Sequence, residues 1–308
     1  MFIIQTQELA TQQYITIQNK KTNCLAKICL TSGGSLQQLY WHGTPVINNL
    51  QGEGDQTSWL NSSGGAILFP FVNRIAEGKY SYNGTLYDLY CNEKDKKNAI
   101  HGLVFDRPFE LTSQSADAEM AQVVLRYEHY LSEGFPFPFR IELTYTITSD
   151  DLLLEVAINN TGSDTFPFSL GWHPYFCSSD LEESCIQVEV NKRVKVDTKM
   201  IPTEVLPFEL DGPIWLEQDL ELDDAFELTD NKIDFHTPDY SLAIESIGST
   251  PPNYVQIYTP SHHKSVAIEP MTAIADSFNN KIGLRELEAE ESFGLIWKLS
   301  YDAAASEE

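Results

Sequence analysis

The chain has 308 residues and a net charge of −25, from 45 acidic and 20 basic side chains. Hydrophobic residues make up 42% of it, which is enough for a large core. Nucleic acids and anionic membranes are bound mainly through Lys and Arg, so we expect neither as a partner. A neutral small molecule is a more suitable ligand for a chain of this charge.

The cysteines are odd in number and none has Cys-x-x-Cys spacing, which argues against a disulfide framework and a zinc knuckle. The first residues, Met1 to Gln5, lack the basic and long apolar parts of a secretory signal. No segment approaches the ~20 apolar residues that span a bilayer. We therefore predict a cytoplasmic protein, as a monomer or a homodimer.

The local patterns along the chain predict many short strands. A short helix is expected near Gln5 to Gln13, and a hairpin at Tyr80 to Tyr87 around the turn residues Asn83-Gly84. Apolar and polar residues then alternate along 141–147, 152–158 and 186–196. Such strands favour stacked antiparallel sheets. Because no linker or repeat interrupts residues 1–308, we predict a single all-β domain.

Four segments set a polar or ionisable residue among apolar, Gly and Pro neighbours. They are Phe71 to Ile75, Asn98 to Gly102, Gly171 to Phe176 and Ala267 to Thr272. A fifth and weaker one is Leu222 to Phe226. The sequence contains no His-x-x-x-His helix, phosphate loop or Gly-x-Ser-x-Gly elbow, so we expect no metal and no nucleotide cofactor.

Each ionisable residue in these segments has a structural as well as a functional interpretation. Arg74 suits a structural ion pair as well as it suits binding of substrate hydroxyls. His101 and His173 suit hydrogen-bonded core positions, although the aromatic residues after His173 also suit a sugar pocket. Glu269 follows a largely apolar run, so its carboxylate requires a partner, a raised pKa or a catalytic role. Asp223 suits a solvated acidic loop, and Pro270 favours an edge strand or a strand end.

Taken in order, these segments resemble the aldose 1-epimerase (galactose mutarotase) family. The resemblance extends from about Ser63 to Trp297 and is carried by the following motifs: Asn73-Arg74-Ile75, Gly78-Lys79-Tyr80, Asn98-Ala99-Ile100-His101-Gly102, Glu133-Gly134-Phe135-Pro136, His173-Pro174-Tyr175-Phe176, Val255-Gln256-Ile257-Tyr258-Thr259 and Ile268-Glu269-Pro270. It implies a large antiparallel β-sandwich with few short helices and an open sugar-binding face.

The resemblance also implies roles for individual residues. Glu269 matches the general base that deprotonates the anomeric hydroxyl, and His173 matches the general acid that protonates the ring oxygen. His101 matches the second active-site histidine. Arg74 and Asp223 match residues that hold sugar hydroxyls, and Gln256 lies where a polar residue near the site is expected. The implied activity is the interconversion of the α and β anomers of a free hexose, without a cofactor.

The sequence departs from the family in two places. Gly171 to Phe176 reads Gly-Trp-His-Pro-Tyr-Phe where many galactose mutarotases have Asn-His-Ser/Thr-Tyr-Phe, and Asp224 stands where a His often follows the sugar-binding Asp. Three alternatives stay open: glycoside hydrolysis by Glu269 with Asp223, a non-catalytic sugar-binding protein, and a hexose-6-phosphate 1-epimerase. The last requires a basic pocket, for which the cations near His101 are Lys94, Lys96, Lys97 and Arg107.

Overall fold

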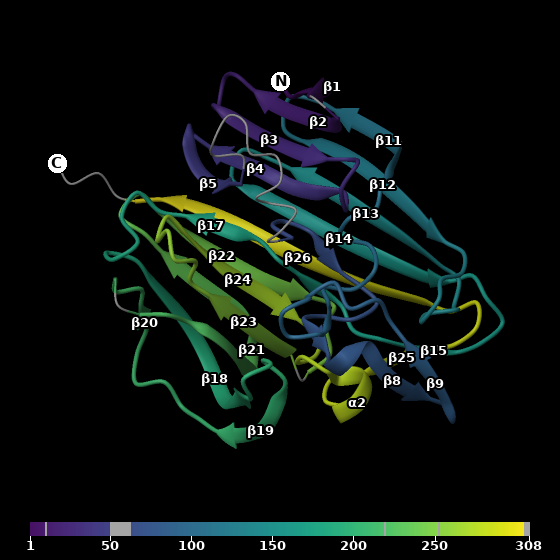
Figure 1. Ribbon diagram of the computed structural model, residues 1–308. Coiled ribbons are helices and arrows are strands. Elements are labelled where there is room, and N and C mark those ends of the chain that lie inside the picture. Colours follow the sequence, from purple (N-terminus) through teal and green to yellow (C-terminus); the bar gives the residue numbers. More distant parts are fainter. Residues whose placement is uncertain (10, 50–62, 219, 252, 305–308) are drawn as a thin grey trace.

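The computed structural model describes residues 1–9, 11–49, 63–218, 220–251 and 253–304, and antiparallel strands dominate it (Figure 1). The first sheet joins neighbours in chain order: β1 (Ile3–Leu9), β2 (Gln12–Asn19), β3 (Cys24–Cys29), β4 (Ser35–Trp41) and β5 (Thr44–Asn48). The predicted all-β class is therefore confirmed.

A second, much larger sheet forms the rest of the sandwich. Its strands follow the spatial order β11 (Glu110–Ala116), β12 (Ala121–His129), β13 (Phe139–Ile147), β14 (Asp151–Asn160), β26 (Ser292–Ala303), β22 (Tyr240–Ile247), β21 (Asp223–His236), β23 (Asn253–Tyr258), β24 (Ser265–Met271), β16 (Gly171–Trp172) and β6 (Ile67–Leu68). Beside this path, β17 (Tyr175–Cys177) pairs with β24, and β18 (Cys185–Val196) pairs with β21, β19 (Pro202–Pro207) and β20 (Ile214–Trp215).

Short elements complete the chain between these sheets. Three two-stranded ribbons are formed by β7 (Arg74–Ile75) with β10 (Ala99–Ile100), β8 (Lys79–Tyr82) with β9 (Thr85–Asp88), and β15 (Phe166–Phe168) with β25 (Arg285–Leu287). The helical elements of the described residues are the 3₁₀ turn η1 (Ala76–Gly78) and α2 (Ser277–Asn280). None of the helices in this part of the chain is long and apolar enough to cross a membrane.

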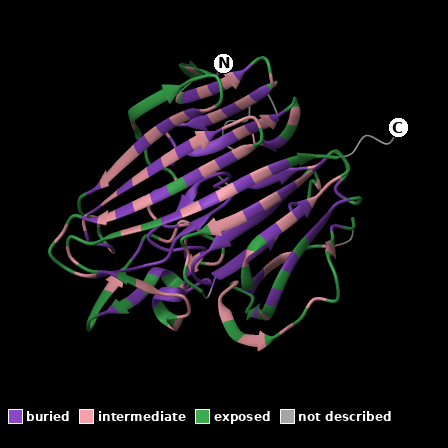
Figure 2. Ribbon diagram, turned by 180° about the vertical axis from the view of Figure 1, so that it is seen from behind, coloured by how far each residue is buried: buried purple, intermediate pink, exposed green. Residues whose placement is uncertain are grey.

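Strand β21 divides the large sheet into two arms. Its first half, Asp223 to Leu228, pairs with β23, whereas Lys232 to His236 pair with β22. One arm continues from β22 through β26 to β11, and the other continues through β23 and β24. Seen from behind, the long strands of the first arm alternate between buried and partly exposed residues (Figure 2). That alternation is the period-two pattern of the sequence.

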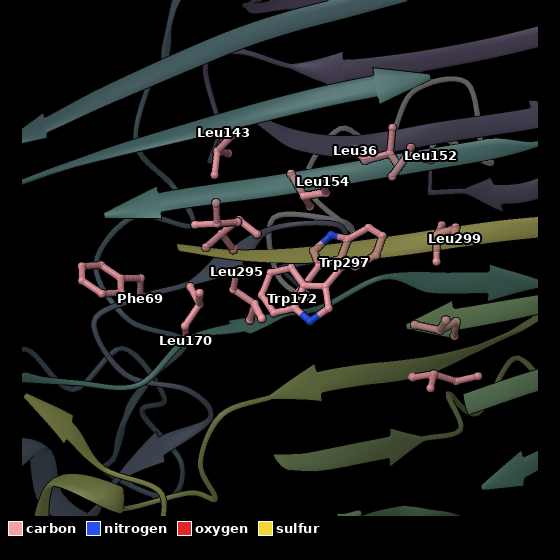
Figure 3. Close-up of a cluster of buried hydrophobic side chains, with 14 of the residues drawn as sticks. Leu36, Phe69, Leu143, Leu152, Leu154, Leu170, Trp172, Leu295, Trp297 and Leu299 are labelled. Atoms are coloured by element: carbon pink, nitrogen blue, oxygen red, sulfur yellow. The ribbon is translucent and has the colours of Figure 1, made fainter. Parts of the chain in front are cut away.

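The core lies between the two arms and the first sheet. Trp172 of β16 stacks on Trp297 of β26 with ring centroids 6.0 Å apart, and leucines of β14 and β26 surround them (Figure 3). Both rings are almost fully buried. Strand β24 is buried along its whole length, which agrees with its continuous apolar run. Both faces of β24 are therefore covered, one of them by the core.

Two local expectations have different outcomes. The hairpin around Asn83-Gly84 is confirmed: Tyr82 pairs with Thr85, and both turn residues have the positive φ of a two-residue turn. The helix expected near Gln5 to Gln13 is wrong, because β1 and β2 pair there as antiparallel strands; residue 10 lies outside the described residues. Strand β1 is an exposed edge, so its sequence carries no clear alternation, and pairing with β2 overrides its helical propensity.

Pro270 lies one residue before the end of β24, which agrees with the expected strand end, but β24 is not an edge strand. On one side it pairs with β23. On the other side it pairs with β17 near Ala267 and with β16 at Met271. Pro270 lies in the gap between those two contacts, where the missing N–H leaves no ladder bond unmade.

Candidate active site

Three neighbouring strands present the acidic and amide side chains of the site. Gln256 of β23 pairs with Glu269 of β24 on one side and with Ala225 of β21 on the other. Since side chains alternate between the faces of a strand, Asp223, Gln256 and Glu269 lie on the same face. Gln256 donates a hydrogen bond of 2.7 Å from Nε2 to Oδ1 of Asp223. Asp223 therefore lies at the start of β21, and the interpretation of it as part of a solvated acidic loop is wrong.

The register of β24 also explains the position of His173. Gly171 pairs with Met271 and Tyr175 pairs with Ala267, so His173 lies midway between these pairs, opposite Glu269. The backbone around His173 leaves β24 there and bonds to another segment. Its N–H donates to the carbonyl of Ala66 at 3.0 Å, and its carbonyl accepts from Gly65 at 2.7 Å. The gap in the ladder of β24 is thus the place where the imidazole enters the site.

Arg74 and His101 come from the small ribbon of β7 and β10. Arg74 pairs with Ile100, and the N–H of His101 donates to the carbonyl of Asn73 at 2.8 Å. The next residue is Gly102, with φ of +77°, where an added Cβ would lie 2.3 Å from the carbonyl oxygen of Phe69. Only glycine permits this close approach, which anchors the segment that carries His101.

All the residues that sequence reasoning placed in the site line one pocket of about 650 Å³. These residues are Arg74, His101, His173, Asp223, Gln256 and Glu269. Its walls also include Tyr175, one of the aromatic residues after His173, and Tyr258, which lies in one of the family motifs. Four further wall residues were not singled out from the sequence: Ser63, Asn92, Glu93 and Phe105. A pocket with several polar side chains and aromatic walls is suited to a small polar ligand with apolar faces.

His173 and Glu269 form the most buried ionisable pair of the pocket. Nε2 of His173 lies 3.5 Å from Oε1 of Glu269, and both side chains are 5% exposed or less. Nδ1 of His173 and Oε2 of Glu269 have no hydrogen-bond partner among the described residues, and neither has Nδ1 of His101. The rings of His101 and His173 lie 5.1 Å apart. Unpaired buried polar atoms are costly, so their presence in a pocket indicates groups that bind or react with a ligand.

Burial shifts the pKa values of this pair in opposite directions. It raises the pKa of Glu269 well above its usual range; the negative charge of Asp223 adds to the shift, and Arg74 opposes it. Burial lowers the pKa of His173 to about 3. It also lowers the pKa of His101, with further contributions from His173 and Arg74. Both shifts favour the neutral form of the pair, in which the carboxyl group of Glu269 holds the proton and the imidazole of His173 is uncharged.

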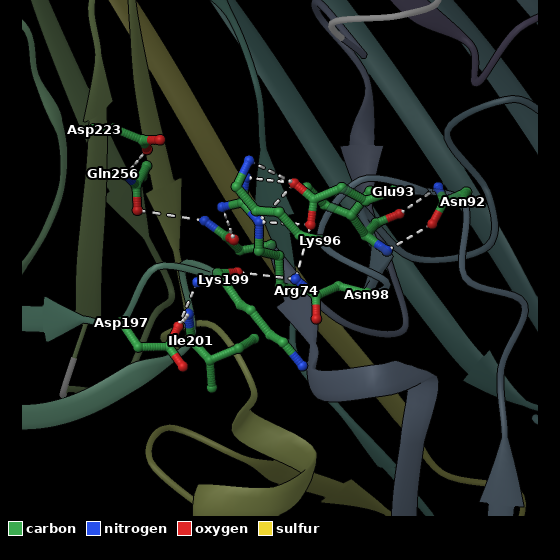
Figure 4. A network of polar contacts seen from close by, with 12 residues as sticks. Arg74, Asn92, Glu93, Lys96, Asn98, Asp197, Lys199, Ile201, Asp223 and Gln256 are labelled. Atoms are coloured by element: carbon green, nitrogen blue, oxygen red, sulfur yellow. Dashed lines mark hydrogen bonds and ion pairs between the residues drawn. The ribbon is translucent and has the colours of Figure 1, made fainter.

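The guanidinium of Arg74 is held by Glu93, which sequence reasoning missed. Nε and Nη2 of Arg74 donate to the Glu93 carboxylate at 2.9–3.1 Å (Figure 4). Nη1 donates to Oδ1 of Asn73 at 3.1 Å, and Nδ2 of Asn73 donates to Gln256 at 3.4 Å. The only available sequence signal was a single acid before the lysine-rich segment 94–97. Both interpretations of Arg74 are thus compatible with its position, since it forms an ion pair and also lines the pocket.

Of the cations considered for a phosphate site, Lys96 is the one that lines the pocket. Its ammonium group lies 3.5 Å from Oε1 of Glu93. Lys94 instead lies over the ring of Tyr90, and Arg107 pairs with Asp106. Within the described ranges, no group of three or more His, Cys, Asp and Glu side chains is arranged to hold a metal ion.

The sequence model of the aldose 1-epimerase family matches residues 13–300. The chain belongs to this family. It is 27% identical over 287 residues to an uncharacterized protein, YihR, of Escherichia coli K12, a match that covers 88% of each chain. Human galactose mutarotase is 27% identical over 170 residues, which are 51% of this chain and 48% of the human one. The resemblance seen in the motifs is thus confirmed at the level of the family.

Solved structures of a galactose mutarotase-like protein and of a galactose 1-epimerase have the same fold. A galactose mutarotase-like protein from Clostridium acetobutylicum superposes with a TM-score of 0.86 at 19% identity, over 98% of this chain and 99% of that one. Galactose 1-epimerase from Lactobacillus acidophilus gives a TM-score of 0.81 at 17% identity, over 99% of both chains. At these identities the likeness establishes the large antiparallel sandwich, and the chemistry has to be argued from the pocket itself.

Proposed function

We propose that the protein is a mutarotase that interconverts the α and β anomers of a free hexose such as glucose or galactose. The observation that carries this proposal is the buried pair of His173 and Glu269, 3.5 Å apart, which lines a polar pocket. Anomer exchange requires removal of a proton from O1 and addition of a proton to O5. Both oxygens are bonded to C1, so the acid and the base have to be close neighbours, as these two side chains are.

In the proposed reaction, the Glu269 carboxylate removes the O1 proton while protonated His173 donates a proton to O5. The C1–O5 bond breaks, and the aldehyde of the open chain forms at C1. After rotation about C1–C2, the neutral imidazole of His173 takes the O5 proton back and Glu269 returns a proton to O1. The pair holds one proton in both states, on His173 with the ring form and on Glu269 with the open chain, so neither side chain has to exchange a proton with solvent.

The pKa shifts of His173 and Glu269 agree with the proton transfers of this reaction. The raised pKa of Glu269 and the lowered pKa of His173 favour the neutral pair, which is the state that accompanies the open-chain sugar. Arg74 lowers the pKa of Glu269 and so favours the carboxylate that begins the reaction from the ring form. These opposing influences of burial and of Arg74 on Glu269 suit an acid–base step that runs in both directions.

We assign the remaining site residues to sugar binding. Arg74, Asp223 and Gln256 form a connected polar wall from which donors and acceptors face the pocket. His101, with its unpaired Nδ1 beside His173, is suited to hold the ring oxygen and the anomeric centre. Such contacts orient the ring and so contribute to rate by positioning.

Polarimetry tests the proposal directly. Freshly dissolved α-D-glucose and α-D-galactose are followed with and without protein, and beside the variants Glu269→Gln and His173→Asn. We expect acceleration by the wild-type protein and a loss of about 10²–10⁴-fold in each variant. His42→Asn is the matched control, because His42 pairs with Asp150 at the exposed surface. Acceleration that survives in both variants contradicts the assigned roles.

The remaining alternatives are outcomes of the same assay. Acceleration with hexose 6-phosphates and not with free hexoses would favour a hexose-6-phosphate 1-epimerase. Binding of a sugar without acceleration would favour a non-catalytic sugar-binding protein. Release of a sugar from a glycoside would favour glycoside hydrolysis by Glu269 with Asp223. These substrates belong in the assay because Lys96, Glu93 and Asp223 all line the pocket and allow different charges on a ligand.

We further propose that residues 1–308 act as one domain, as a monomer or homodimer in the cytoplasm. One core cluster includes side chains from Phe2 to Tyr301, which supports a single folding unit. The cysteines at 24, 29, 91, 177 and 185 are all free, which supports a reducing compartment. Size-exclusion chromatography with light scattering measures the oligomeric state, and two separate unfolding transitions would contradict the single domain.

A further inference from the structure

The contact between Arg74 and Glu93 is a forked ion pair inside the wall of the pocket. Three hydrogen bonds of 2.9–3.1 Å join Nε and Nη2 of Arg74 to the two oxygens of Glu93. Their side chains are 12% and 15% exposed, so the pair is poorly screened by water. This arrangement fixes the plane of the guanidinium and directs Nη1 toward Asn73 and the pocket (Figure 4).

Glu93 is itself held in place by the segment that follows it. Glu93 and Asn98 exchange backbone hydrogen bonds of 3.1 and 3.2 Å across the turn 94–97. Nδ2 of Asn98 donates to Oε2 of Glu93 at 2.8 Å and to the carbonyl of Lys199 at 3.0 Å. The carboxylate is therefore fixed by a closed turn and by the connection between β18 and β19, neither of which includes a residue assigned to the reaction.

The charge of Arg74 acts on the reacting pair, and Glu93 acts on that charge. Burial raises the pKa values of Glu269 and Asp223, and the positive charge of Arg74 opposes both shifts. Burial lowers the pKa of His101, and Arg74 adds to that shift. Hydrogen bonds from Arg74 and Asn98, together with nearby cations, outweigh burial and hold the pKa of Glu93 below its usual range, so Glu93 stays ionised beside the guanidinium.

Several elements place ionisable groups around Glu269. They are His173 between β16 and β17, Asp223 on β21, Arg74 on β7, His101 after β10, and Tyr175 and Tyr258 on β17 and β23; Glu93 and Lys96 lie behind Arg74. Removing the negative charge of Glu93 leaves two cations, Arg74 and Lys96, without their common partner. The positive potential at Glu269 then increases.

We propose that Glu93 is a positioning residue for the reaction, which acts through Arg74 by fixing its guanidinium and by offsetting its charge beside Glu269. This inference rests on the mutarotase function proposed above. It assigns to Glu93 an effect on the orientation of the sugar and on the acid–base pair, without a contact between Glu93 and the reacting atoms.

The experiment uses Glu93→Gln, Arg74→Gln and the double variant in the full chain. Glu142→Gln is the matched control, because Glu142 accepts the same two donors, Nε and Nη2, from Arg126 on strands β12 and β13, away from the pocket. Each variant is assayed for kcat and KM as a function of pH. The titration of Glu269 is also followed by carbon NMR of its carboxyl group, with Glu269→Gln identifying the signal.

For Glu93→Gln we expect kcat/KM to fall about tenfold to a hundredfold, the range for a positioning group displaced by a fraction of an ångström. We also expect the Glu269 titration and the alkaline limb of the pH profile to move to lower pH. The double variant should match Arg74→Gln within about twofold, because most of the effect of Glu93 on the site passes through Arg74, and the more exposed Lys96 is the one other cation described here that it offsets. It also keeps the proposal testable if Glu93→Gln folds poorly, since the buried charge is removed with its partner.

Two results would overturn the proposal. One is an unchanged Glu269 titration in Glu93→Gln, equal to that of Glu142→Gln. The other is a loss in the double variant equal to the product of the two single losses, which means that Glu93 acts independently of Arg74. Absence of mutarotase activity in the wild-type protein would refute the proposed function instead, and the NMR titration still decides whether Glu93 controls the charge at Glu269.

Discussion

Replacing Glu269 by Gln should make the protein's stability depend less on pH, because the change removes the ionisation of a buried carboxyl group and keeps its size. Glu269 is 3% exposed, and burial raises its pKa well above the ordinary value. In the unfolded chain the group releases its proton near its ordinary pKa of 4.5. As the pH rises from there to the raised pKa, the unfolded state is favoured, so wild-type stability is fully present below that window and is lost within it.

The size of this effect follows from the linkage of one proton to unfolding. Within the window, the unfolding free energy of the wild-type protein falls by about 1.4 kcal/mol per pH unit relative to Glu269→Gln. His173 works in the opposite direction, since its pKa is lowered to about 3 and stability falls as the pH drops below 6.5. That contribution arises near and below pH 6.5, so it adds little to the slope above that pH.

Urea unfolding followed by tryptophan fluorescence, at a series of pH values above 4.5, measures the difference. The variant is expected to gain on the wild-type protein steadily as the pH rises, while its mutarotase activity is lost. Glu142→Gln, which neutralises a partly exposed carboxylate on β13, serves as the control and should show no such trend. Parallel stability curves for wild type and Glu269→Gln would refute the argument that Glu269 is buried with a raised pKa.

Three further outcomes are expected. Trp172→Ala removes the ring that stacks on Trp297 and should lower the unfolding free energy by about 3–5 kcal/mol, as measured by urea unfolding. Gly102→Ala places a Cβ 2.3 Å from the Phe69 carbonyl oxygen and should cost about 1–3 kcal/mol with a reduced kcat/KM, because His101 is its neighbour; an unchanged thermal midpoint contradicts this. The acid limb of the kcat/KM profile should lie well below 6.5, because the pKa of His173 is about 3; a limb at 6.5 indicates a solvated imidazole.

The alternating strands and the Asn-Gly hairpin were predictable from the sequence because their signals are local. The alternation from Ile141 to Ile147 appears directly in β13, where those residues are buried. The prediction of a helix at Gln5 to Gln13 was wrong because this segment carries no reliable local signal. An exposed edge strand buries few side chains, so its conformation depends on pairing with β2 and not on its own pattern.

The candidate site residues were accessible from the sequence as short motifs in a family order, while Glu93 was not. Glu93 lies in a charged segment whose composition is typical of a solvated turn. Its contact with Arg74 depends on how the ribbon of β7 and β10 places the turn 94–97 against the pocket. A side chain whose importance comes from one partner across a loop leaves no periodic signal.

By itself, the sequence determined the strand-rich class of this protein, its family resemblance and the identities of six residues that line the pocket. Only the tertiary structure decided which of them meet. His173 lies opposite Glu269 because β16 and β17 pair with β24 on either side of a gap, and Gln256 lies beside Glu269 because β23 has one particular register. Burial in that pocket then shifts their pKa values in opposite directions. Register and burial are properties of distant segments packed together, so no local pattern in the chain contains them.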